Sequence, residues 1–319
     1  MPLTNADLLR KAAGPIATGD IGSGAGHGLL SDEQSTEFLR RVYDTTPFSQ
    51  AQRNETRRSA EGTINKMGIG GRILRKKNEG VDDATLVKPD FGEVEYAVKR
   101  YRADSEINEE VFEDNIEGEG FEDRWIGEVT GQIGRDLEDL HFNGDTTDTS
   151  ADAAFLTQNS GWLYQLANAG LAHRVNGAAV NGGAIEKSHF FDGFQALPDK
   201  YKAQADQMRW LMSPTNKSRW LEYLTGRSTA AGDSALLGQG GDRPHGILIQ
   251  EIPAMPNTRI LLANTSQFIV LNTRDIRIRR TTEGREAIRQ DKRFYAIFID
   301  DDPIIEEQDG VVDIYGMAA

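Results

Sequence analysis

Histidines and a run of aspartates are the residues of this sequence whose types could support catalysis or metal binding. The five histidines are widely separated and show none of the close spacings with which histidines ligate a metal. They are His27, His141, His173, His189 and His245. His141 falls at the C-terminal end of a predicted helix, where a histidine interacts favourably with the helix dipole. We therefore expect His141 to have a structural role.

Asp300, Asp301 and Asp302 are consecutive carboxylates, and such oxygen ligands bind hard cations. They precede Pro303 at the expected end of a strand, so a solvated turn is the more ordinary interpretation. Acidic pairs also abound in 104–123, but proximity means little in so acidic a segment. The sequence has neither a G-x-S-x-G motif nor a dinucleotide-binding fingerprint, and it has no cysteine for thiol or zinc chemistry. It therefore predicts neither an enzyme nor a cofactor site.

The charge of the chain is unevenly distributed. Its 319 residues carry a net charge of −14. Because no apolar run reaches roughly 18 residues, we expect no membrane span, and the N-terminus does not predict secretion. Residues 93–145 hold 17 acidic and 5 basic residues, whereas residues 38–77 hold 10 basic and 3 acidic ones. Such asymmetry suits a nucleic-acid-binding arm or self-association between unlike patches. The basic segment lacks interleaved aromatic residues, which favours self-association.

The element around which the chain is organised is a helix predicted within 115–145. Apolar residues recur there every three or four positions, as in an amphipathic helix of about six turns. These residues are Phe121, Trp125, Val129, Ile133, Leu137 and Leu140, with Ile126 beside them. Asn115 suits the N-cap, and Asn143 with Gly144 suits the C-terminal end.

Four glycines fall on the opposite face of this predicted helix, at Gly120, Gly127, Gly131 and Gly134. Each glycine inside a helix costs roughly 1 kcal/mol relative to alanine. One interpretation is a solvated face that tolerates small residues. The other is that a second backbone crosses this face closely, where a side chain would not fit.

The remaining segments predict an α+β protein with segregated helices and strands. A glycine-rich arm at 1–30 precedes a helix from Ser31 to about Thr46. Strands at 69–74 and 94–101 predict a long hairpin, and two strands alone are not stable in water. Helices are expected at 161–166, 190–205 and 215–225, the last with Ser213 as N-cap. Further strands are expected at 209–212, 247–252, 260–262, 267–271, 276–278, 293–300 and 310–315.

This order of elements resembles that of tailed-phage major capsid proteins of the Hong Kong 97 type. Local strings are similar as well, and their spacing resembles capsid proteins of phages that infect actinobacteria. They are Glu113–Gly118 before the helix, Asp136–Leu140 and Asn143–Asp145 at its end, Met212–Pro214, Leu236–Gly238, Arg243–Gly246 and Ile252–Pro256. The resemblance spans nearly the whole chain, although each string is short.

The resemblance implies a phage capsid fold with five segments. They are an N-terminal arm at 1–52, an extended hairpin arm (E-loop) at 53–92, a peripheral domain with a spine helix at 93–150, an axial domain at 151–267 and returning strands of the peripheral domain at 268–319. It also implies hexamers and pentamers that form the virion capsid in the host cytoplasm and enclose double-stranded DNA without sequence-specific binding. No charged helical leader precedes the arm, so a separate scaffold protein or scaffold-free assembly is implied, and decoration proteins are further partners. The covalent cross-linking of the type member cannot be carried over, because no residue here identifies its participants.

We expect two groups of residues to make contacts between copies of the chain. The first consists of the basic residues Arg53, Arg57, Arg58, Arg72, Arg75, Lys76 and Lys77, which would meet acidic surfaces such as 104–123. The second is the glycine face of the predicted helix. An encapsulin, which is a nanocompartment shell protein of the same fold, is the main alternative. A carboxylate-dependent hydrolase would need two acids across a pocket, and no such pair can be nominated.

Overall fold

The structure is a computed structural model that describes residue 48 and residues 51–68, 90–114, 120–168, 173–226, 243–274, 276–281 and 285–319. The arm at 1–30, the expected helix from Ser31 to Thr46 and the expected strand at 69–74 lie outside these residues. In the described part, helices and strands form a mixed α+β fold, as the sequence predicts. No described helix is long and apolar enough to cross a membrane.

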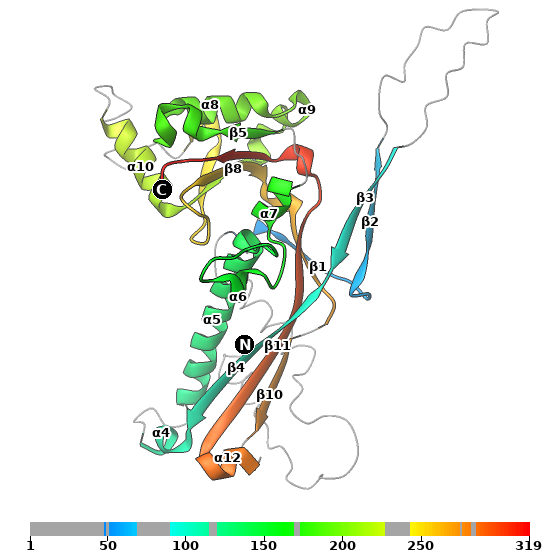
Figure 1. Cartoon of the computed structure of the whole chain (residues 1–319), viewed down its shortest axis with the longest axis vertical. Coiled ribbons are helices and arrows are strands. Elements are labelled where there is room, and N and C mark those ends of the chain that lie inside the picture. The colour runs from blue at the N-terminus through cyan, green and yellow to red at the C-terminus, as the bar shows by residue number, and fades with distance from the viewer. Residues whose placement is uncertain are drawn as a thin grey trace, which may run out of the picture.

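The first sheet has five strands, which are β1 (Arg53–Thr56), β9 (Phe268–Asn272), β11 (Lys292–Ile305), β10 (Arg277–Thr281) and β4 (Lys99–Asn108). Its centre is β11, which pairs with β4 along one edge and with β9 and then β10 along the other. The spine helix α5 (Gly120–Asn143) lies alongside this sheet (Figure 1). Two short helices, α4 (Glu109–Asp114) and α12 (Arg285–Gln290), were not expected from the sequence.

The second sheet has the order β5 (Arg174–Asn176), β12 (Val312–Tyr315), β8 (Arg259–Asn264), β6 (Met208–Met212) and β7 (Leu248–Glu251). Its helices are α8 (Lys187–Ala196), α9 (Asp199–Lys202) and α10 (Pro214–Thr225), and 3₁₀ turns lie at 177–179, 181–183, 205–207, 244–246, 265–267 and 308–310. The Ser213 hydroxyl accepts a hydrogen bond from the Asn216 backbone N–H at 3.2 Å, which confirms the predicted N-cap of α10.

The expected helix at 190–205 is divided in two. Leu197 is extended because proline disfavours the helical conformation in the residue before it, and Pro198 is then the N-cap of α9. The helix at 161–166 is present as α7 (Trp162–Asn168), preceded by the one-turn α6 (Ala153–Leu156). The hairpin arm consists of β2 (Glu61–Gly68) and β3 (Asp90–Ala97), paired antiparallel, and it stands away from the body in Figure 1.

Two strands lie in a different place from the one expected. Residues 53–56 were assigned to the hairpin arm, but β1 pairs in parallel with β9 of the first sheet. Residues 312–315 were assigned to the peripheral domain, but β12 pairs with β5 and β8 of the second sheet. Both strands are only four residues long and have partners far away in sequence, so no local pattern specifies the sheet that they join.

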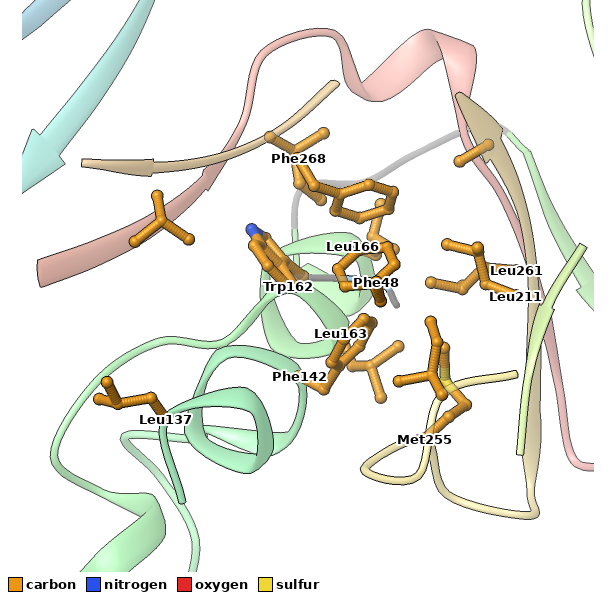
Figure 2. Packing of buried hydrophobic residues seen from close by; sticks show 14 of the residues in the cluster. Phe48, Leu137, Phe142, Trp162, Leu163, Leu166, Leu211, Met255, Leu261 and Phe268 are labelled. Atoms are coloured by element: carbon orange, nitrogen blue, oxygen red, sulfur yellow. The ribbon is translucent and has the colours of Figure 1, made fainter. Parts of the chain in front are cut away.

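Three apolar clusters hold these layers together. The largest lies between α5, α7 and the inner faces of both sheets, and Phe48, Phe142, Trp162 and Phe268 form its aromatic centre (Figure 2). Their ring centroids lie 4.9–5.7 Å apart in tilted or edge-on pairs, which is the favoured geometry for aromatic contacts. A second cluster lies between the second sheet and α8 and α10. The third lies under the root of the hairpin arm.

Candidate assembly surfaces and a buried polar cluster

The aspartates 300–302 lie inside strand β11 and do not form a solvated turn. Asp300, Asp301 and Asp302 are 9%, 0% and 6% exposed, respectively. The expected strand end before Pro303 is wrong, because β11 continues through Pro303 to Ile305. Pairing of β11 with β4 stops at Asp301, and beyond it β9 is the one described strand that pairs with β11, so a proline that donates no hydrogen bond is tolerated.

Asp301 contacts the end of the spine helix. Nε2 of His141 lies 3.0 Å from Oδ2 of Asp301, and both side chains are buried. His141 was expected to interact with the helix dipole, and the structure adds this carboxylate as its direct partner. Burial raises the pKa of the Tyr101 hydroxyl well above its usual value, and the nearby charge of Asp301 raises it further. The contact between His141 and Asp301 joins α5 to the centre of the first sheet.

Asp302 connects the same region to the root of the hairpin arm. Its Oδ2 accepts a hydrogen bond from the Ala97 backbone N–H at 2.8 Å, and its Oδ1 accepts one from Asn159 Nδ2 at 3.2 Å. The same amide group lies 2.9 Å from the Tyr101 hydroxyl oxygen. Burial raises the pKa of Asp302 to about 6, against the opposing effect of these hydrogen bonds.

Asp300 is the outermost of the three. It accepts a hydrogen bond from Arg100 Nε at 2.8 Å, and Arg274 Nε lies 3.8 Å away. Among the described residues, no group of three or more histidine, aspartate or glutamate side chains is placed to hold a metal ion. The aspartates are instead occupied by side chains and backbone of the first sheet, α5 and the loop at 159. We interpret this polar cluster as a junction between elements.

The basic residues predicted for contacts between copies are only partly described. Arg53 lies 2.8 Å from both Glu55 and Glu306, and Arg57 lies 2.6 Å from Glu55, so both form ion pairs within the subunit. Arg58 is exposed. The other four, Arg72, Arg75, Lys76 and Lys77, lie outside the described residues. Their role in assembly remains a prediction.

The glycine face of α5 is open at its middle and buried near its C-terminal end. Among the described residues, a Cβ atom on Gly127 would have no neighbour within 4 Å, and one on Gly131 would meet only Nη1 of Arg135, at 3.7 Å. Gly134 is buried, so it differs from the exposed Gly127, and the role of the four glycines stays a prediction. Most side chains in the last turns of α5 are buried, Glu138 and His141 included, while Arg135 and Asp136 stay exposed. The surroundings of Gly120 lie outside the described part of the structure.

The hairpin arm carries an acidic face that the sequence analysis missed. Glu61, Glu93 and Glu95 are exposed on one side of the arm, and Met67 and Phe91 follow them on the same side. The strict alternation of exposed and half-buried residues at 61–67 indicates this face. It was missed because the strand expected at 69–74 lies later in the chain than β2.

Comparison with solved structures identifies the fold. The chain superimposes with a TM-score of 0.63 on a chain of the satellite phage P4 procapsid, a structure that includes the size determination (Sid) protein, at 12% identity, covering 89% of this chain and 100% of that one. Microbacterium phage Oxtober96 gives 0.57 at 12% identity, covering 99% of both chains. The SrpI encapsulin of Synechococcus elongatus PCC 7942 gives 0.51 at 11% identity, covering 92% of both. The chain therefore has the fold of phage capsid proteins, and phages of actinobacteria are among its structural neighbours.

A curated relative provides a sequence match. The chain is 27% identical over 323 residues to the "Putative prophage capsid protein YqbE" of Bacillus subtilis (strain 168), and the match covers 98% of each chain. No protein-family model matches the chain.

Proposed function

We propose that the chain is the major capsid protein of a tailed phage or prophage, and that its copies assemble into a closed shell. The observation that carries this proposal is the match to a prophage capsid protein over 98% of both chains. The fold supports it independently, because phage capsid structures cover nearly the whole chain. On this basis the chain is a structural protein of the virion, and its chemistry is that of self-association.

The geometry of the arm suits a shell subunit. A two-stranded ladder is marginal in water, and the support that the described residues give to β2–β3 lies at its root, where Ile64, Val94 and Tyr96 pack against Ile269, Leu271 and Ile304. An arm that leaves the body in this way gains further support where a neighbouring copy covers it.

The finer assignments are part of the same proposal. We assign the Hong Kong 97 type of capsid fold, with the first sheet and α5 as the peripheral domain and the second sheet as the axial domain. Copies would form hexamers and pentamers and enclose double-stranded DNA without reading its sequence. A separate scaffold protein, decoration proteins and assembly in the bacterial cytoplasm complete the assignment.

Electron microscopy of the purified protein tests the proposal. Closed shells, rings or tubes in negative stain, with matching large species in light scattering, are the expected result. A small monodisperse monomer at all concentrations would contradict the proposal. Shells that copurify with an encapsulated enzyme would instead indicate an encapsulin, the alternative with the lower structural similarity among those compared.

A further inference from the structure

The two faces of the hairpin arm differ in chemistry. In the β2–β3 ladder, Thr63 pairs with Glu95, Asn65 with Glu93 and Met67 with Phe91, so these residues share one face. Ile64, Val94 and Tyr96 lie on the other face and pack on the first sheet. The first of these faces, with Glu61 at its start, is termed the acidic arm face.

The acidic arm face is poorly compensated within its own subunit. Met67 and Phe91 are 75% and 64% exposed, although a paired methionine and phenylalanine are typical core residues. Glu93 and Glu95 are two residues apart on β3 and therefore lie on the same face, where their like charges repel each other. None of the three glutamates forms an ion pair within the part of the chain that the structure describes. The face therefore combines an apolar end with uncompensated negative charge.

A surface of opposite composition lies at the far end of the first sheet. Helix α12 exposes Arg285, Arg289 and Ile288, and the isoleucine is 70% exposed. Arg279 of the adjacent strand β10 is also exposed, with its guanidinium 5.7 Å from the ring centre of Phe298. Arg285 and Arg289 form no ion pair among the described residues. These four residues are termed the basic corner.

The two surfaces cannot meet within one subunit. In Figure 1 the strands β2 and β3 rise from one end of the first sheet, and α12 lies at the opposite end. We propose that the acidic arm face of one copy docks on the basic corner of a second copy. The carboxylates of Glu93 and Glu95 would face Arg285 and Arg289, and the Met67–Phe91 pair would cover Ile288. This inference rests on the proposed function and names the surfaces that one of its contacts uses.

Charge complementarity favours a second copy over other occupants of the acidic arm face. Nucleic acid and anionic lipid both carry negative charge, which the three glutamates would repel. Every copy of the chain carries the matching basic and apolar surface. That surface is therefore present wherever copies assemble. Complementary charge across such a contact sets its partner and its register.

Charge reversal followed by a charge swap tests the contact. One variant carries Glu93→Arg and Glu95→Arg, a second carries Arg285→Glu and Arg289→Glu, and a third combines all four substitutions. Each single-sided variant should lower the yield of closed shells by roughly tenfold or more, because like charges would then face each other at every repeat of the contact. The combined variant should recover most of that loss, because the pairs are restored with reversed polarity.

The controls separate this inference from the proposed function. Asp206→Arg with Asp309→Arg changes the net charge as the arm variant does, at exposed positions away from both surfaces, and should assemble like the wild type. Thermal unfolding of each isolated subunit shows that the variants are folded. Wild-type protein that forms no shells would contradict the proposed function. If the wild type forms shells, two results would overturn the docking proposal alone. One is normal assembly of the single-sided variants, and the other is a combined variant that is as defective as the single-sided ones.

Discussion

Burial and hydrogen bonding have opposite effects on the pKa of the Asp302 carboxyl group. Burial raises its pKa from the ordinary 3.8 to about 6, so the fold favours the protonated side chain. The stability that this group contributes is therefore fully present below pH 3.8 and is lost as the pH rises through about 6. The largest possible loss is roughly 3 kcal/mol.

Asp302→Asn should remove this pH dependence. We expect the unfolding free energy of the variant, relative to the wild type, to increase from pH 4 to pH 7, because asparagine cannot ionise. Urea denaturation of the isolated subunit across this range measures the difference. Asp309→Asn, at an exposed position, serves as the control and should follow the wild type. Parallel curves for Asp302→Asn and the wild type would show that Asp302 does not titrate in this range.

Two glycines at the end of the spine helix are required by close backbone packing. A Cβ atom on Gly161 would lie 2.7 Å from the Gly144 nitrogen and 2.8 Å from the Phe142 carbonyl oxygen. Gly161→Ala should therefore destabilise the subunit by roughly 1–3 kcal/mol through overpacking. Gly127→Ala is the matched comparison, because it has open space and should stabilise the isolated subunit by up to about 1 kcal/mol. Equal melting temperatures for the two variants would contradict this prediction.

At the scale of elements, the open part of the α5 glycine face provides a test of contacts between copies. Among the described residues, a Cβ atom at Gly131 would meet only the end of Arg135, so we expect Gly131→Leu to be accommodated within the subunit. If a neighbour's backbone crosses this face, the variant should fold normally and fail to assemble. Circular dichroism and electron microscopy measure the two properties separately. A folded variant that assembles normally would assign this face to solvent.

Local signals predicted the elements that local interactions determine. The apolar stripe of α5 and the serine–proline start of α10 are contained in short segments, so the sequence alone located both. The positions of β1 and β12 depend on partners far away in the chain, and they were misassigned. Asp301 and Asp302 were misread for the same reason, since their partners His141 and Asn159 come from distant segments.

At the scale of the whole molecule, the contrast between arm and body predicts a pattern of hydrogen exchange. Strand β9 is completely buried, with Phe268 and Val270 facing the main core and Ile269 and Leu271 facing the arm root. Its amides should exchange slowly in the isolated subunit and in the shell. The amides of β2 and β3 near Met67 and Phe91 should exchange quickly in the subunit and much more slowly in the shell. Equal protection of these strands in both states would count against arm docking.

The pairing of early with late strands also determines when the molecule can fold. Strand β1 can pair only after β9 has been synthesised, more than 200 residues later, and β4 can pair with β11 only after a similar interval. Strand β5 likewise pairs with β12, and the paired residues Arg174 and Asp313 are 139 positions apart in the sequence. Neither large sheet can close on a half-synthesised chain, and pairing over such separations is slow. A nascent subunit therefore exposes unpaired strand edges for most of its synthesis, which makes its yield sensitive to chaperones and to temperature.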